Sequence, residues 1–302
     1  MKDVAIVGSG VTGLAAGLYA ARYELSTTII GDMLGGATST AWTVENYPGF
    51  ESIDGYDLVM KMKEQVEKLG VKLVTDKVIK AEKKAETFVL TTEEDQTIET
   101  KTVVLTMGAA RRKLNLPKED DFAKGKGIHY CTTCDGPLYK GKIMAIIGGG
   151  DAAIKGANLA VQYATKIYIV EMTDHLNPEP TNMKRLQPFI DKGQVEVSLN
   201  TKVGSLLGEE KLTGLKLDDG RELKVDGVFV EIGAIPDVEL AKQLGVTLDE
   251  RGYITVNNMM ETNIPGVYAA GDTTNFFGHF KQIITGCAQG AVAATSAFKH
   301  LG

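Results

Sequence analysis

A strand–turn–helix–strand pattern with a small-residue turn occurs twice in this 302-residue chain, and it constrains the fold more than any other feature. In the first copy, an apolar strand, the sequence GSGVTG, a small-residue helix and a second strand follow one another between residues 4 and 30. Gly8 permits the tight turn, Gly10 lets the backbone approach a pyrophosphate, and Gly13 lets the helix pack close to the strand. The alternative is a tight turn that binds nothing.

The second copy begins with an apolar strand over 143–147 and continues into the sequence GGGDAA. Gly148, Gly150 and Ala153 occupy the three small-residue positions of this turn. Glu171 follows the next strand, about 20 residues past the turn, where an acid that binds the ribose hydroxyls belongs. Its carboxylate would favour NADH over NADPH, although it could also be a surface acid at a strand end. In the first copy, the candidate for the same role is Asp32. The chain therefore carries two predicted dinucleotide sites.

Other apolar runs complete the predicted α/β pattern. A helix is expected over 57–69, and strands over 71–74, 87–92 and 97–101 are interpreted as a small antiparallel insertion. Further predicted elements are strands over 103–106, 166–170, 195–199, 212–217, 225–230 and 267–270, and helices from Leu14 to about Arg22, over about 152–163 and over 283–298.

Two of the three cysteines stand close together, in the sequence Cys131-Thr132-Thr133-Cys134-Asp135-Gly136. Thiols at this spacing can close a small disulfide ring or share a metal ion, but a zinc site needs two further ligands. The remaining cysteine is Cys287, and the histidines at 129, 175, 279 and 300 show no paired ligand spacing. We therefore expect no metal site, and we interpret the pair as a redox dithiol. Cys287 lies among alanines and glycines and is predicted to be a buried small side chain.

Composition excludes several other classes. A formal charge of −6 argues against nonspecific nucleic-acid binding. No apolar run approaches the roughly 20 residues that span a bilayer, and no export signal is recognisable at the start of the sequence. Few cysteines and no such signal favour a reducing cytoplasm, where a close cysteine pair is more often catalytic than structural.

With these residues in view, the chain resembles the low-molecular-weight thioredoxin reductases, which are FAD-dependent pyridine nucleotide–disulfide oxidoreductases. The likeness covers nearly the whole length. The motifs that carry it are Gly8–Gly13, Gly35-Gly36 with Val44–Gly49, Thr106–Ala109, Cys131–Gly136, Gly148–Ala153, and Gly271-Asp272 with Lys281–Ile283.

The resemblance implies two Rossmann-like, three-layer ββα nucleotide-binding domains, the second inserted into the first. The FAD domain would comprise 1–113 and 240–302, and the nicotinamide and dithiol domain 114–239. A homodimer and a large domain rotation are also implied. Cys131 would attack the partner disulfide, Cys134 would lie nearest the flavin, and Asp135 would be the acid that moves a proton. The resemblance assigns FAD contacts to Gly8, Gly10, Gly13, Asp32, Gly36, Asn46, Gly108, Gly271, Asp272, Lys281, Gln282 and Ile283.

Two departures from the family pattern bear on function. Ala37 replaces a glutamine, and the basic cluster that binds the 2′-phosphate of NADPH is replaced by Glu171-Met172-Thr173. The favoured hypothesis is electron flow from NADH through FAD and Cys131–Cys134 to a thioredoxin or glutaredoxin-like protein. Alternatives are a non-nicotinamide donor such as ferredoxin, an oxidase of small dithiols, and a flavin-binding redox sensor.

Overall fold

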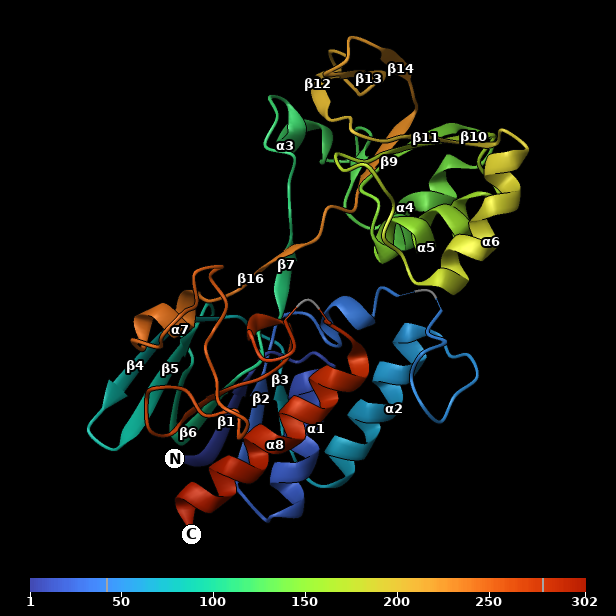
Figure 1. Ribbon diagram of the computed structural model, residues 1–302. Coiled ribbons are helices and arrows are strands. Elements are labelled where there is room, and N and C mark those ends of the chain that lie inside the picture. Colours follow the sequence, from blue (N-terminus) through green and yellow to red (C-terminus); the bar gives the residue numbers. More distant parts are fainter. Residues whose placement is uncertain (42, 279) are drawn as a thin grey trace. The chain divides into compact units, whose positions relative to one another are not determined.

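The computed structural model describes residues 1–41, 43–278 and 280–302. It contains two compact units, Met1–Ala110 with Pro236–Gly302, and Arg111–Ile235 (Figure 1). The second unit is thus inserted into the sequence of the first. The chain passes between the units through β7 (Ala109–Arg111) and β16 (Ala234–Pro236), which pair with each other as a two-stranded sheet.

The first unit is built on a sheet of seven strands. Parallel pairing joins β3, β2, β1, β6 and β17 in that order, and β5 and β4 extend the same sheet through antiparallel pairing with β6. The strands are β1 (Lys2–Val7), β2 (Thr27–Ile30), β3 (Lys72–Val74), β4 (Val78–Lys84), β5 (Thr87–Thr92), β6 (Thr97–Leu105) and β17 (Val267–Ala269).

The alternation of side chains along each strand gives this sheet two buried faces. Val4 and Ile6 of β1 belong to one core, with residues of α1 (Val11–Arg22), α2 (Gly55–Lys68) and α8 (Ile283–Leu301). Ala5 and Val7 belong to the other, with the β4–β5 hairpin and α7 (Glu239–Gln243). Figure 1 shows α1, α2 and α8 together against the strands. Two short 3₁₀ helices cover Gly36–Thr38 and Gly271–Thr273.

The predicted antiparallel insertion is wrong in one strand. β3 pairs in parallel with β2, with Thr28 opposite Lys72, so it is an edge strand of the main sheet. The runs predicted at 97–101 and 103–106 form the single strand β6, whose first part pairs with β5 and whose second part pairs with β1 and β17. Periodicity identified these strands but could not assign their partners, because pairing depends on residues distant in sequence.

The second unit repeats the three-layer arrangement. Its sheet is entirely parallel, with strand order β11-β10-β9-β15-β8. Helices α5 (Asp151–Ala160) and α6 (Pro180–Asp191) bury one face, and a three-stranded antiparallel sheet buries the other. The strands are β8 (Ile128–His129), β9 (Ile143–Ile147), β10 (Lys166–Val170), β11 (Val195–Ser198), β12 (Val203–Leu207), β13 (Gly214–Leu217), β14 (Glu222–Lys224) and β15 (Gly227–Val230). The predicted fold class, two ββα Rossmann-like units, is confirmed.

Several elements differ from the sequence prediction at their ends. α1 begins at Val11, directly after the glycine turn, rather than at Leu14, and α8 continues to Leu301 rather than ending at 298. The helix predicted over 152–163 ends at Ala160. Helices α3 (Glu119–Phe122), α4 (Thr132–Asp135), α6 and α7 were not predicted, and neither were β12 and β14. Most of these are short elements whose packing, rather than local pattern, fixes their conformation.

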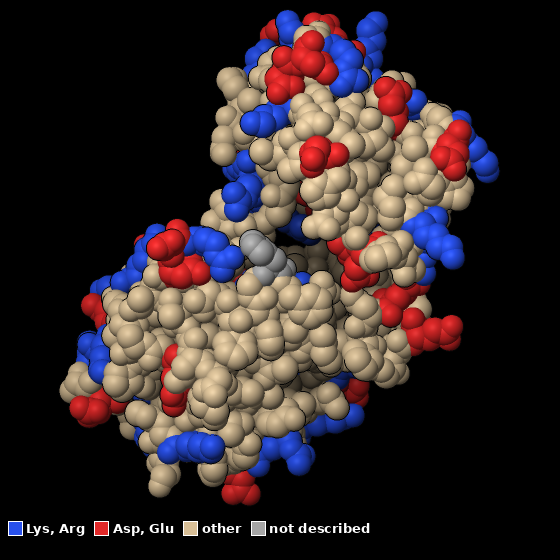
Figure 2. Space-filling view, in the orientation of Figure 1, with Lys and Arg blue, Asp and Glu red and all other residues tan. Residues whose placement is uncertain are grey.

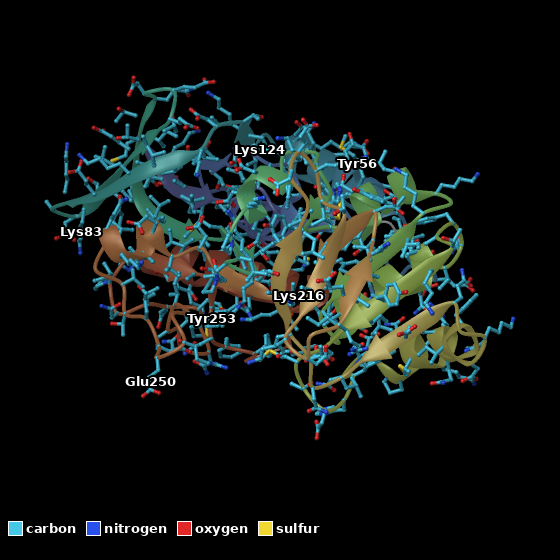
Figure 3. The ribbon with its side chains drawn as sticks, turned by 90° about the horizontal axis from the view of Figure 1, so that it is seen from above. Tyr56, Lys83, Lys124, Lys216, Glu250 and Tyr253 are labelled. Carbon is cyan, nitrogen blue, oxygen red and sulfur yellow. A yellow bond between two sulfur atoms is a disulfide. The ribbon has the colours of Figure 1, made fainter. Side chains whose placement is uncertain are left out.

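The surface carries both signs of charge. In Figure 2, Lys and Arg are interspersed with Asp and Glu on the visible face of each unit, and the sticks of Figure 3 show charged side chains such as Lys83, Lys124 and Glu250 extending outward. Within the ranges that the structure covers, no helix is long and apolar enough to cross a membrane.

Candidate functional site

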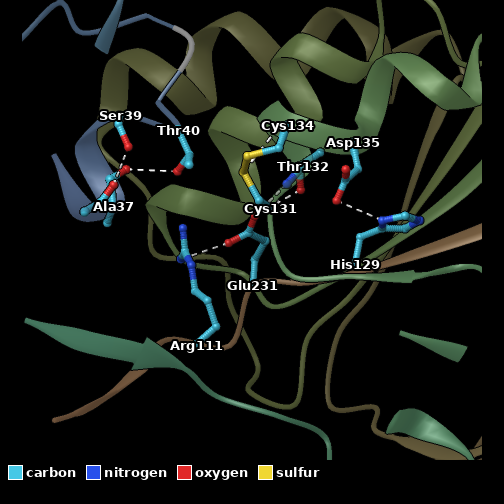
Figure 4. Close-up of a disulfide and its surroundings, with 11 residues drawn as sticks. Ala37, Ser39, Thr40, Arg111, His129, Cys131, Thr132, Cys134, Asp135 and Glu231 are labelled. Carbon is cyan, nitrogen blue, oxygen red and sulfur yellow. Dashed lines mark hydrogen bonds and ion pairs between the residues drawn. A yellow bond between two sulfur atoms is a disulfide. The ribbon is translucent and has the colours of Figure 1, made fainter. Parts of the chain in front are cut away.

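Cys131 and Cys134 form a disulfide at the start of a short helix in the second unit (Figure 4). Cys131 is the N-cap of α4, and its sulfur accepts a hydrogen bond from the Cys134 amide at 3.2 Å. The predicted ability of the pair to close a small ring is confirmed. Cys134 is exposed and Cys131 is partly exposed, so another thiol can reach the pair.

Glycines hold the dithiol segment close to the rest of the second unit. A Cβ at Gly156, on α5, would lie 2.7 Å from Thr132 Cβ. A Cβ at Gly227, at the start of β15, would lie 2.3 Å from the Tyr139 ring. At Gly136, it would lie 2.1 Å from the hydroxyl of Tyr163, whose pKa burial raises to about 12. Side chains at these three positions would push the segment away, so the glycines fix where the disulfide stands.

Asp135, the predicted acid, is hydrogen-bonded to a histidine that the sequence analysis did not select. His129 Nδ1 lies 2.9 Å from Asp135 Oδ2, and His129 Nε2 lies 2.8 Å from the Tyr139 hydroxyl. The imidazole also stacks on Phe229, with ring centroids 5.0 Å apart. Burial raises the pKa of Tyr139, and the charges of Asp135 and Asp226 add to the effect. Asp135 is therefore the outer end of a short chain of proton-bearing groups that leads into the protein.

On the Cys131 side of the disulfide lies a second carboxylate. Glu231 directly follows β15 and is buried, and its Oε1 lies 3.1 Å from both the amide nitrogen and the hydroxyl of Thr132. Its Oε2 lies 3.2 Å from the Arg111 guanidinium. Figure 4 shows Glu231 between Arg111 and Cys131. The sequence carried a signal for this residue, because an acid ends an apolar run at the carboxyl end of a parallel strand, where ligands of α/β sheets gather.

The second glycine turn has the geometry of a dinucleotide site. Gly148 has φ of +121°, and a Cβ there would lie 2.4 Å from the Glu231 carbonyl oxygen. A Cβ at Gly150 would meet nothing within 4 Å, which leaves room for a ligand at the start of α5. Burial opposes the ionisation of Asp151, in the first turn of α5, but the Lys155 ammonium and the Glu179 amide hold the pKa of that carboxyl below its ordinary value. The Asp151 carboxylate is therefore bound by groups of the protein itself, the Lys155 ammonium and the Glu179 amide.

Glu171 lies over this turn. A Cβ at Gly149 would stand 2.8 Å from Glu171 Oε2, and Glu171 Oε1 accepts hydrogen bonds from the amide and hydroxyl of Thr173, each at 2.8 Å. The carboxylate is thus held at the place predicted for a ribose-binding acid. The loop after β10 returns to the glycine turn, where Asn177 and Gly150 form an isolated parallel β-bridge.

The first glycine turn repeats this geometry in the first unit. Gly8 has φ of +111°, and a Cβ there would lie 2.3 Å from the carbonyl oxygen of Thr106. At Gly13, it would lie 1.9 Å from the Gly8 carbonyl oxygen, so the helix can pack here only without a side chain. Gly10 forms an isolated parallel β-bridge with Gly35, just as Gly150 does with Asn177. The first turn of α1 carries no acid and no side-chain cap, so its amides are free to bind phosphate.

In the first unit, the position that corresponds to Glu171 is occupied by Gly31, and Asp32 lies one residue beyond it. After β2 the chain continues with Gly31, whose amide bonds to Val74, just as the Glu171 amide bonds to Ser198. Gly31 therefore lies against Ser9 of the turn, and a Cβ there would be 2.5 Å from the Ser9 nitrogen. Asp32 itself is exposed.

The C-terminal part of the first unit brings the remaining predicted FAD residues together. Gly271 donates its amide to Gln289 Oε1 at 2.6 Å, and a Cβ there would lie 2.7 Å from the Thr12 hydroxyl of α1. This packing places Asp272 near the start of α1. Burial raises the pKa of Asp272, and the Lys281 ammonium opposes that shift. Burial lowers the pKa of Lys281. Its ammonium nitrogen lies 4.7 Å from the ring centroid of Tyr253, which is labelled in Figure 3.

A hydrogen bond joins two residues that the resemblance assigned to FAD from opposite ends of the sequence. Asn46 Nδ2 lies 3.0 Å from the Oε1 of Gln282, which also forms the capping box of α8, the helix that Ile283 begins. Gly36 and Gly108 both have positive φ, +53° and +70°. Open glycine turns, free helix amides and the polar side chains near them fit an FAD molecule in the first unit.

Cys287 and the histidines that the structure describes belong to no cluster that could hold a metal ion. Cys287 is partly buried, and burial raises its pKa to about 11 against the opposing effect of Tyr47. No cluster of three or more His, Cys, Asp or Glu side chains that could hold a metal ion occurs among the described residues. His279 lies outside them.

Comparison with known proteins places these features in a family. Residues 2–294 match the pyridine nucleotide-disulphide oxidoreductase family. A thioredoxin reductase of Mycoplasma pneumoniae is 35% identical over 297 residues, which cover 96% of this chain and 92% of that protein. This chain belongs to the pyridine nucleotide-disulphide oxidoreductase family. Its family members use FAD, and the chain is a flavin-dependent oxidoreductase of the thioredoxin reductase-like group.

Two solved structures give the same assignment. The thioredoxin reductase of T. acidophilum has a TM-score of 0.90 at 36% identity, covering 99% of this chain and 98% of that one. A ferredoxin-flavin thioredoxin reductase from Clostridium acetobutylicum has a TM-score of 0.53 at 35% identity, again covering 99% and 98%. These two structures have nearly the same sequence identity to this chain, and the name of only one of the two includes ferredoxin.

Proposed function

We propose that this oxidoreductase passes two electrons from NADH, through FAD, to the Cys131–Cys134 disulfide and on to a thioredoxin or glutaredoxin-like protein. In this proposal the unit that carries α1 and α8 binds FAD, and the inserted unit binds the nicotinamide and carries the dithiol. The observation that carries the proposal is the exposed disulfide beside Asp135, in the same unit as the second glycine turn. The thioredoxin reductases among its relatives support the choice of partner.

The dithiol half of the reaction follows from the placement of the sulfurs. Reduction of the disulfide adds two electrons and two protons and leaves two thiols. A thiolate at Cys131 attacks one sulfur of the partner disulfide and forms a mixed disulfide, and the partner's other sulfur leaves as a thiolate. Cys134 then attacks Cys131, which restores the ring and releases the reduced partner. In this proposal Asp135, the residue after Cys134, takes a proton from the attacking thiol and returns one to the leaving sulfur.

Bound FAD supplies the hydride chemistry between the nicotinamide and sulfur. The residues proposed to hold it are the turn Gly8, Gly10 and Gly13, with the free amides of α1 at its phosphates. Asp272 is proposed to accept hydrogen bonds from its ribityl chain, and the segment Gln282–Ile283 to lie at its ring system. Asn46 would fix Gln282 in place through their hydrogen bond.

Glu171 supports NADH as the donor. A fixed carboxylate over the glycine turn accepts hydrogen bonds from both ribose hydroxyls of NADH and repels an added phosphate. Thr173 holds one oxygen of this carboxylate, and the other lies against Gly149. The proposed preference therefore rests on a carboxylate that Thr173 holds close to the glycine turn.

A second donor has support of its own. The ferredoxin-flavin thioredoxin reductase of Clostridium acetobutylicum is as similar in sequence to this chain as the Mycoplasma protein is. Such a donor would deliver single electrons to the flavin and would leave the second glycine turn unused. NADH is favoured because Gly148, Gly150 and Ala153 keep the small residues that a nucleotide requires.

The donor is decided by stopped-flow reduction of the FAD-loaded protein with NADH, NADPH and a reduced ferredoxin system. We expect flavin bleaching with NADH within seconds and slower bleaching with NADPH. If NADH leaves the flavin oxidised while ferredoxin bleaches it, the donor part of the proposal is wrong and the dithiol part stands.

The dithiol is tested separately with thioredoxin as acceptor and the best donor from that screen. Cys134→Ser and Cys131→Ser should each abolish thioredoxin reduction while flavin bleaching by the donor persists. Cys287→Ser is the matched control, because it removes a thiol from α8 and should leave the rate unchanged. Thioredoxin reduction by Cys134→Ser would contradict the relay.

A homodimer and a cytoplasmic location are part of the same proposal, through the family resemblance. The mass of the FAD-loaded protein in solution tests the first: we expect about twice the 32.4 kDa of one chain. Cell fractionation tests the second.

A further inference from the structure

The strongest unassigned feature of the second unit is the ion pair beside Cys131 between the buried Glu231 and the exposed Arg111. The Glu231 side chain is only 4% exposed, and Arg111 is its one charged contact within hydrogen-bond distance among the described residues. An ionised carboxylate in such a place is stable only when a cation and hydrogen-bond donors compensate it. Arg111 and Thr132 supply both.

The pair is joined to the dithiol through the backbone. Thr132 directly follows Cys131, and its amide and hydroxyl both lie 3.1 Å from Glu231 Oε1. Since the Thr132 nitrogen is bonded to the Cys131 carbonyl carbon, bond lengths alone keep the carboxylate within roughly 10 Å of the Cys131 sulfur. The buried Glu231 is not exposed to a partner disulfide as Asp135 is, so it needs a role other than proton exchange with that disulfide.

We propose that Glu231 and Arg111 are positioning residues that set the reduction potential of the Cys131–Cys134 couple through their opposing charges. When the pH lies between the pKa values of the first and the second thiol, reduction adds two electrons and one proton to the disulfide and leaves one thiol and one thiolate. The Cys134 amide donates to Cys131 Sγ, so the negative charge is best accommodated on Cys131. Reduction therefore creates an anion next to Glu231 and Arg111.

The two residues act on that anion with opposite sign. Glu231 destabilises the reduced, thiolate-bearing form, and Arg111 stabilises it. At an effective dielectric constant of about 20, the Glu231 charge within about 10 Å changes such an equilibrium roughly tenfold. The Arg111 guanidinium contacts the other carboxylate oxygen and is 40% exposed, so it offsets this effect only in part. Other titratable groups that the structure describes near the dithiol segment are His129, Asp135, Tyr139 and Tyr163, and they remain unchanged in every variant below.

The inference deepens the proposed dithiol relay and rests on the pair being redox-active. Its test uses the FAD-loaded, full-length protein at pH 9 in mixtures of reduced and oxidised dithiothreitol, followed by acid quenching, alkylation and mass spectrometry of the peptide that contains both cysteines. No nicotinamide, ferredoxin or thioredoxin is present. If the wild-type disulfide cannot be titrated, the proposed function fails; if it titrates and the variants do not shift, only the inference fails.

The expected shifts have opposite directions. Glu231→Gln keeps an oxygen for Thr132 but removes the negative charge, and it should favour the dithiol about tenfold, which is about 30 mV for a two-electron couple. Arg111→Gln should favour the disulfide by a smaller factor, because solvent screens its exposed guanidinium. The double variant should lie between wild type and Glu231→Gln, because both charges are gone.

Arg112→Gln is the matched control, since Arg112 is the next residue and is exposed, and its guanidinium contacts only the Ala234 carbonyl oxygen, at 3.5 Å, among the bonds of the described residues. It should leave the equilibrium unchanged. A purely structural role for the pair predicts that both single variants shift the potential in the same direction, or neither does, and that the double variant is no closer to wild type. Either pattern would overturn the inference. Thr132→Val, which removes one hydrogen bond and no charge, separates loss of order from loss of charge.

Discussion

His129 bridges Asp135 and Tyr139, with its two ring nitrogens 2.9 Å and 2.8 Å from their oxygens. Asp135 adjoins the disulfide, and Tyr139 is buried against Gly227. The imidazole therefore fixes the orientation of the acid and connects it to a group away from the surface. If Asp135 moves the proton of the thiol exchange, its efficiency depends on this contact.

Replacement of His129 should slow dithiol exchange. His129→Phe keeps the stacking on Phe229 but removes both hydrogen bonds, and we expect thioredoxin reduction to fall about tenfold, the effect of one hydrogen bond to a charged group. In Asp135→Asn the rate of thioredoxin reduction should fall further, by about 10²–10³-fold, because a positioned acid contributes this much to the rate. The double variant should be no slower than Asp135→Asn alone, since the histidine acts through the acid. Flavin bleaching by the donor is the control. Equal rates for His129→Phe and wild type would contradict the role.

Glu171 should determine which nicotinamide is used. Glu171→Ala removes the carboxylate that would bind the ribose hydroxyls, and kcat/KM for NADH should fall about 10–100-fold, since each lost bond to a charged group is worth about 1.5–3 kcal/mol. The value for NADPH should change little or rise, because repulsion of its phosphate is removed. Steady-state rates with both donors measure the ratio. Asp174→Asn is the control: it removes a nearby exposed charge without touching the turn. A parallel loss for both donors would mean that the loop, not the charge, was disturbed.

Close packing at Gly156 should matter for both stability and the dithiol. In Gly156→Ala the new methyl group would lie 2.7 Å from Thr132 Cβ, so α4 must move or α5 must bend. We expect a loss of about 1–3 kcal/mol in the free energy of unfolding in urea, the usual cost of overpacking. Gly204→Ala is the matched control, because the nearest atom to its methyl group is the Lys216 carbonyl oxygen at 3.4 Å, an ordinary contact. Similar free energies of unfolding for both variants would show that α4 can move away from the new methyl group at little cost.

The sequence predicted the two glycine turns, the ability of Cys131 and Cys134 to form a disulfide, and the ββα class because each depends on local pattern. Gly8 and Gly148 need positive φ, and an apolar strand followed by such a turn has few other folds. It did not predict the partner of β3, since a three-residue strand pairs wherever the sheet has a free edge. It also missed His129 and Glu231. Their partners, Asp135 and Thr132, are six and 99 residues away, and only the packing of β8, α4 and β15 brings them together.

Asp272 offers a test in which stability and cofactor binding change in opposite directions. Burial raises the pKa of this carboxyl in the folded protein above its ordinary value of 3.8, so the folded state binds the proton more tightly than the unfolded chain does. As pH rises from below 3.8 through the folded pKa, the unfolded chain ionises first and the apoprotein loses stability. At neutral pH the ionised Asp272 is therefore a net cost in the absence of FAD, which the nearby Lys281 offsets only in part.

Asp272→Asn should accordingly raise the melting temperature of the FAD-free protein at pH 7, and the gain over wild type should shrink as the pH falls towards 3.8. The same variant should bind FAD about 10–100-fold more weakly, because a neutral amide replaces the charged acceptor proposed for the ribityl hydroxyls. Thermal unfolding of the apoprotein and flavin fluorescence titration measure the two quantities. Asp249→Asn is the matched control, since Asp249 is hydrogen-bonded to Tyr253 and Arg251 and its pKa is lowered; this variant should lose stability instead. If Asp272→Asn destabilised the apoprotein at pH 7, the carboxylate would be a structural partner of Lys281 rather than a group held ready for the cofactor.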